Sequence, residues 1–123
     1  MRKRAEPYIL LAERALRQLE QYVPDSEKAF LDQPVLQDAV LLQLLQIGEN
    51  LSQLRSGFPD QFSRAPESWD QIIGLRNTIA HGYERIRIAE VWGYLVNDLA
   101  DLRISLNTAR SEGWFESPNR AED

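Results

Sequence analysis

Residues 36–54 decide the fold, and they read LQDAVLLQLLQIGENLSQL. Apolar side chains recur here every three or four residues, which is the period of an α-helix. The pattern predicts a helix from about Pro34 to Gly57, with an apolar stripe of Leu36, Val40, Leu44, Ile47, Leu51 and Leu54. A second stripe of Leu41, Leu45 and Gly48 makes this face wider than one neighbour needs. We therefore expect the helix to pack inside the domain and also against a second body, such as another copy of the chain.

Gly48 stands in the middle of that helix. A glycine in a helix interior costs about 1 kcal/mol relative to alanine. Two interpretations stay open: a tolerated glycine, or a position where another backbone or a ligand comes too close for a Cβ atom.

The rest of the chain also has the helical period, and no stretch alternates as a strand would. Further helices are expected over about 7–22, 27–31, 68–82 and 88–110, with a short turn at 60–62. Ser68 is the expected N-cap of the third long helix, and Gly82 its expected end. Amphipathic helices with short links imply an all-α fold, an antiparallel bundle of four to five helices. We expect a helical domain over 1–112 and a mobile tail over 113–123.

Composition excludes several classes of site. The chain has 123 residues, enough for one domain, with no cysteine and one histidine, His81. Disulfides, thiolate zinc sites and cysteine nucleophiles are therefore excluded. A metal site would need carboxylates or ligands shared between chains, and we expect neither a metal nor a cofactor.

Charge and hydropathy limit the partners. The longest apolar runs are far shorter than the ~20 residues of a membrane span, and no long apolar segment follows the basic start. We expect a cytoplasmic protein without membrane contact. The net charge of −5 argues against a broad nucleic-acid surface, which needs a basic patch. Any contact with RNA is expected to be local.

Residues 74–83, GLRNTIAHGY, place four polar side chains near a helix end: Arg76, Asn77, His81 and Tyr83. Asn77 and His81 are four apart and share a helix face. Arg76 and His81 are five apart, so an ideal helix points them about 140° away from each other. The long arginine stem, a helix that ends at Gly82, or two copies that meet across a two-fold axis could bring them together.

RNA cleavage without a metal is the chemistry that fits these groups. Imidazole can take a proton from a ribose 2′-hydroxyl or give one to the leaving oxygen. A guanidinium offers paired donors to phosphate oxygens that gain charge. Asn77 could orient His81 or hold a phosphate oxygen. The alternative reading is that the pair is accidental and that His81 only caps the helix.

The same segment resembles the HEPN superfamily, specifically its HepT-like branch. That mark is an arginine, a polar residue, three further residues, a histidine and, two positions on, a tyrosine, which matches RNTIAHGY at 76–83. Further similar elements, over roughly residues 5–108, are IGE at 47–49, Trp69, IIGL at 72–75 and VW at 91–92. The resemblance implies a HEPN-like homodimer whose motifs face a shared cleft, with Arg76, Asn77 and His81 as catalytic residues.

The resemblance also implies a function and its control. It implies a metal-independent endoribonuclease that acts as the toxin of a type VII-like toxin–antitoxin pair. The implied partner is a nucleotidyltransferase-fold antitoxin that transfers AMP to Tyr83, where added bulk and charge would obstruct the substrate phosphate. Tyr83 could instead be an ordinary half-buried aromatic. Glu49 could lie near the cleft, or be an exposed charge or a helix-to-helix salt bridge.

Two other function classes fit the sequence. One is a non-catalytic helical dimer that serves as the partner or substrate of a nucleotidyltransferase. The other is a nucleotide-binding accessory subunit in which Arg76 grips a triphosphate. The motif indicates which RNA bond would break, but the sequence does not indicate a surface that recognises the bases.

Overall fold

The computed structural model describes residues 4–116, and this part of the chain is helical without strands. Its helices are α1 (Glu6–Tyr22), α2 (Glu27–Leu31), α3 (Pro34–Gly57), α4 (Pro59–Phe62), α5 (Glu67–His81), the 3₁₀ turn η1 (Tyr83–Arg85), α6 (Ile88–Asn97) and α7 (Leu99–Ser111). The prediction of an all-α antiparallel bundle is confirmed. None of the described helices is both long and apolar enough to cross a membrane.

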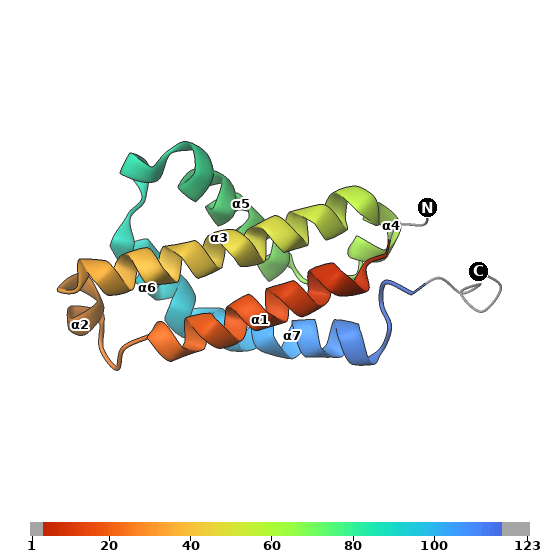
Figure 1. Cartoon of the computed structure of the whole chain (residues 1–123), viewed down its shortest axis with the longest axis horizontal. Coiled ribbons are helices and arrows are strands. Elements are labelled where there is room, and N and C mark those ends of the chain that lie inside the picture. The colour runs from red at the N-terminus through yellow and green to blue at the C-terminus, as the bar shows by residue number, and fades with distance from the viewer. Residues whose placement is uncertain (1–3, 117–123) are drawn as a thin grey trace.

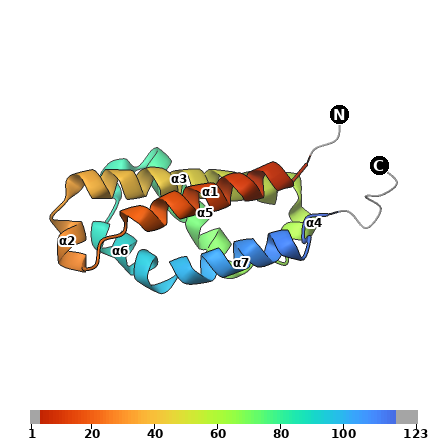
Figure 2. The same cartoon turned by 60° about the horizontal axis from the view of Figure 1, so that its bottom comes forward.

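Helix α3 is the central element, and its wide apolar face, from which we expected a second body, contacts two neighbours within the chain. It packs against α1 on one side and α5 on the other, and α7 packs against α1. Figure 1 shows α3 running the length of the molecule antiparallel to α1, and Figure 2 shows α6 and α7 in a layer beneath them. The side chains of the main α3 stripe from Val40 to Leu54 are fully buried, whereas Leu36 at its start is only partly covered.

The helix expected over 88–110 is instead two helices, which corrects the prediction. The break is at Asp98, where φ is −120° and ψ is −15°. Helix α6 packs on α2, with the Phe30 and Trp92 rings 5.6 Å apart, while α7 packs on α1. One straight helix could not pack on both α2 and α1. The break falls at an aspartate, which has a low helix propensity.

Helix α5 starts one residue earlier than expected, so Ser68 is not its N-cap. Pro66 is the cap, with an extended backbone at ψ 159° and a carbonyl that accepts a hydrogen bond from Trp69 N at 3.0 Å. The Ser68 hydroxyl is buried without a partner. Proline already has the φ that a helix entry needs, so no side-chain cap is required there.

Trp69 anchors the end of the bundle where α4 and α7 meet. It is fully buried and donates a hydrogen bond from Nε1 to Ser105 Oγ at 2.8 Å. Phe115 is 6% exposed and stacks on the Trp69 ring with centroids 6.2 Å apart. Residues 113–116 of the expected tail therefore pack on the domain, and residues 117–123 lie outside the described part of the chain.

Candidate active site

Arg76 is held by two contacts at the centre of the candidate site. Its Nη2 forms an ion pair with Glu49 Oε2 of α3, and its Nη1 donates a hydrogen bond to Asn77 Oδ1 at 2.7 Å. The side chain is 24% exposed, and its Nε is buried without a partner. A guanidinium has five N–H donors, so N–H bonds remain on both terminal nitrogens for a phosphate. The two contacts thus hold Arg76 in position while other N–H donors of its guanidinium stay free.

Gly48 brings α5 close enough for this arrangement. A Cβ atom at Gly48 would overlap Cβ of Arg76 and lie 2.9 Å from its Cγ and 3.0 Å from the Ile72 carbonyl oxygen. Such contacts leave no room for a side chain at position 48. The structure therefore supports the second interpretation of Gly48, the close approach of another backbone.

Glu49 forms a helix-to-helix salt bridge with Arg76. A hydrogen bond from Gln53 Nε2 at 3.2 Å and the interaction with Arg76 lower the pKa of Glu49 below its usual value. The carboxylate is partly exposed and lines the same groove as Arg76. Of the interpretations of Glu49, the helix-to-helix salt bridge is confirmed, and its partner is the candidate catalytic arginine.

His81 is the last residue of α5, and the helix ends there as expected. Gly82 N donates to the Thr78 carbonyl at 2.8 Å, and Gly82 then turns the chain away. The Gly82 φ of −154° is not left-handed, so its backbone conformation does not require glycine. The His81 side chain is exposed and has no hydrogen bond or ion pair within residues 4–116.

The structure does not join Arg76 to His81 within one chain. Arg76 faces α3 and is half-buried, whereas Asn77 and His81 are exposed on α5. This is the divergence that a spacing of five residues predicts. Asn77 contacts Arg76 through its amide oxygen, so it orients the arginine rather than the histidine in the described chain.

Tyr83 lies two residues past His81, in η1, and is 53% exposed. Its hydroxyl donates a hydrogen bond to Asp38 Oδ1 of α3 at 2.7 Å. This bond raises the pKa of the Tyr83 phenol, because the neighbouring carboxylate stabilises the protonated form. Asp38 was not recognised from the sequence, since the pair is 45 residues apart and no motif connects them.

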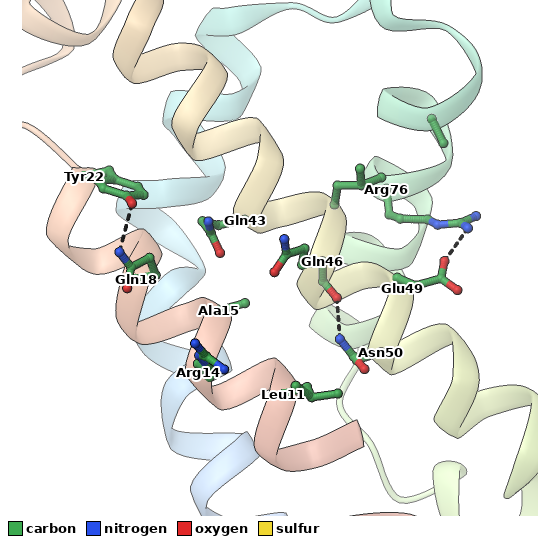
Figure 3. Close-up of a pocket in the computed structure, with 12 residues that line it drawn as sticks. Leu11, Arg14, Ala15, Gln18, Tyr22, Gln43, Gln46, Glu49, Asn50 and Arg76 are labelled. Atoms are coloured by element: carbon green, nitrogen blue, oxygen red, sulfur yellow. Dashed lines mark hydrogen bonds and ion pairs between the residues drawn. The ribbon is translucent and has the colours of Figure 1, made fainter. Parts of the chain in front are cut away.

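A groove of about 890 Å³ crosses the face formed by α1, α3 and α5 and reaches Arg76. Figure 3 shows Arg14 and Gln18 on the α1 side, Gln43 and Gln46 on α3, and Arg76 with Glu49 at one end. Its size falls in the range of small-molecule and cofactor sites.

Comparison with known proteins identifies the family of this chain. The family model described as "Ribonuclease HepT-like" matches residues 12–109, most of the chain. The chain belongs to the HepT-like ribonuclease family. A curated protein described as "Putative RNase", from Caldanaerobacter subterraneus subsp. tengcongensis, is 29% identical over 73 residues, covering 59% of this chain and 63% of that protein. The chain thus matches less than two thirds of that relative's length. No solved structure matches significantly.

Several elements that resemble this family serve the fold rather than the site. Trp69, Ile72, Ile73 and Val91 are buried in the core. In contrast, the groove could not have been found from the sequence. Its lining comes from three helices, and only their packing brings those side chains together.

Proposed function

We propose that this chain is a metal-independent endoribonuclease, a cytoplasmic toxin of a type VII-like toxin–antitoxin pair. The observation that carries the proposal is Arg76, fixed by Glu49 and Asn77 at the end of a groove, on the helix that ends in an unpaired His81. Membership of a ribonuclease family supports the same reaction class.

The reaction needs only the substrate's own nucleophile. The ribose 2′-oxygen attacks the adjacent phosphorus and the bond to the 5′-oxygen breaks, leaving a 2′,3′-cyclic phosphate. The 2′-hydroxyl loses a proton and the 5′-oxygen gains one, and His81 is the proton carrier. Arg76 binds the phosphate oxygens as their charge grows, through the N–H bonds that Glu49 and Asn77 leave free.

The site is proposed to be completed in a homodimer. The divergence of Arg76 and His81 within one chain favours a cleft where a second copy brings its own motif beside the first. A two-fold axis near the end of α5 would place Arg76 of one chain close to His81 of the other.

Tyr83 is the proposed point of control. A nucleotidyltransferase antitoxin would join AMP to the phenol oxygen, which attacks the α-phosphorus of ATP, displaces pyrophosphate and loses its proton. The modified oxygen could no longer donate to Asp38, and its phosphodiester would face that carboxylate with like charge. The exposure of Tyr83 and its place beside His81 support this role.

Cleavage of RNA in the presence of EDTA tests the proposal. We expect the purified chain to cut single-stranded RNA to products that end in a 2′,3′-cyclic phosphate, and His81→Ala and Arg76→Ala to lose this activity. Gln21→Ala, an exposed change on α1, is the control. Cleavage that persists in His81→Ala, or that appears only with added metal, would contradict the assignment.

A further inference from the structure

Gln43 is the one buried polar residue among residues 4–116, and its amide has no partner. The residue is 9% exposed, yet no hydrogen bond joins it to another described residue. Its amide atoms are not fully buried, so they reach the open space of the groove. Gln43 lines the groove, and Figure 3 shows it between α1 and α3. An unpaired amide that faces the groove beside Arg76 is available to bind a ligand.

Arg14, across the groove from Gln43, also lacks an ion-pair partner among the described residues. Most arginines in the described part of the chain pair with a carboxylate, as Arg110 does with Glu13 at 2.7 Å. The lining carries two arginines against one carboxylate, in a chain whose net charge is −5. The groove is therefore a local exception to the acidic charge of the protein.

Most other polar groups of the lining are amides, beside the Tyr22 hydroxyl: Gln18, Gln43, Gln46 and Asn50. Amides donate and accept at once, as recognition of base edges requires, while arginines bind phosphates. The α1 side runs from Leu11 to Tyr22, about 16 Å at the helical rise, which is room for several nucleotides. Two of these amides already donate within the chain, Gln18 to the Tyr22 hydroxyl and Asn50 to the Gln46 carbonyl, so the amides of Gln43 and Gln46 remain to bind a ligand.

We propose that this groove binds the single-stranded nucleotides next to the cleaved bond, with Arg14 on a phosphate and Gln43 on a base edge. The inference rests on the proposed ribonuclease function, because the groove ends at Arg76. The groove would then be a local RNA-binding surface on an otherwise acidic chain, and Gln43 would be a position that recognises bases.

A fluorescent, fully 2′-O-methylated ten-nucleotide RNA tests binding apart from cleavage, because it has no free 2′-hydroxyl. We expect Arg14→Gln and Gln43→Leu each to raise its Kd at least about fivefold. The slope of log Kd against log salt concentration should fall by about 0.7 for Arg14→Gln and stay unchanged for Gln43→Leu. The controls are Arg17→Gln, one turn along α1 and outside this groove, and Gln21→Leu. Both controls should leave the Kd unchanged.

Folding and assembly are measured on the same variants. Removal of an unpaired buried amide should leave the melting temperature of Gln43→Leu unchanged or raise it. A Kd equal to wild type in both groove variants overturns the proposal, and so does an equal loss in Arg17→Gln. A shift in oligomeric state by Gln43→Leu with unchanged Kd would assign the groove to a second copy, which also overturns it.

These experiments distinguish a failure of the ribonuclease proposal from a failure of the groove proposal. If ordinary RNA is not cleaved but the methylated RNA binds in an Arg14- and Gln43-dependent way, the groove stands and the ribonuclease proposal fails. If RNA is cleaved and the groove variants bind like wild type, the ribonuclease proposal stands and the groove assignment is wrong.

Discussion

Gly48 and Arg76 face each other across the α3–α5 contact with no room for a Cβ atom between them. The candidate catalytic arginine is thus placed by a missing side chain on another helix. Glu49, the next residue of α3, then pairs with the guanidinium. Two neighbouring residues of α3 therefore decide where Arg76 lies.

Gly48→Ala should push α3 and α5 apart. We expect a loss of about 1–3 kcal/mol in the free energy of unfolding, as for other overpacked core positions, together with a loss of RNA cleavage. Urea unfolding and a cleavage assay measure the two effects. Gly74→Ala is the matched control, because a Cβ there meets nothing within 4 Å and alanine favours the helix by about 1 kcal/mol. A destabilised Gly74→Ala, or a Gly48→Ala as active as wild type, would contradict this account.

Glu49→Gln should release Arg76 without removing any atom of the motif. We expect kcat/KM for RNA to fall on the order of tenfold, since a misplaced guanidinium no longer meets the phosphate. Glu90→Gln is the control, because that carboxylate pairs with Arg87 on the exposed surface of α6. Equal activity in Glu49→Gln and wild type would show that Arg76 needs no such anchor.

The hydrogen bond from Gln53 to Glu49 and the ion pair of Glu49 with Arg76 also predict a pH dependence. Its pKa lies below the usual value of 4.5, so the fold favours the carboxylate. The corresponding stability is present above pH 4.5 and is lost as the pH falls through the lowered pKa. The difference in melting temperature between wild type and Glu49→Gln should therefore shrink on acidification below pH 4.5. A constant difference down to pH 2 would argue against the pairing.

Asp38→Asn should lower the pKa of the Tyr83 phenol, because a neutral amide accepts a weaker hydrogen bond from the phenol and no longer repels the phenolate. Ultraviolet titration of phenolate, with Tyr83→Phe subtracted to isolate this tyrosine, measures the change. Asp60→Asn, on the distant helix α4, is the control. An unchanged Tyr83 titration in Asp38→Asn would show that the hydrogen bond is absent in solution.

Phe115→Ala should destabilise the domain by about 3 kcal/mol, because it removes a buried ring stacked on Trp69. Ile104→Ala removes a 61% exposed apolar side chain and should be nearly neutral. Urea unfolding of both variants compares them. A neutral Phe115→Ala would mean that the domain ends before residue 113.

A mixture of Arg76→Ala and His81→Ala proteins tests a site shared between chains. If Arg76 of one chain works with His81 of the other, half of the dimers are mixed and hold one intact site, so about a quarter of wild-type activity should return. Each variant alone should stay inactive. Activity in the mixture no higher than in the separate variants would argue against a shared site.

The sequence by itself determined the helices and the motif. Periodic apolar side chains predicted α1, α2 and α3 almost to the residue, and the spacing of Arg76 and His81 predicted their divergence. These features are local, so the helical period and the order of residues suffice to infer them. The end of α5 at His81 was also predicted correctly from Gly82, although Gly82 does not have the left-handed conformation on which that prediction rests.

Only the tertiary structure decided which distant groups meet. The break at Asp98 follows from two helices that pack on different neighbours, and the contact of Gly48 with Arg76 depends on how closely α3 and α5 approach. The Asp38–Tyr83 bond and the groove around Gln43 likewise join residues far apart in the chain. Packing selects such contacts from the shapes of whole helices, and no spacing within one helix encodes them.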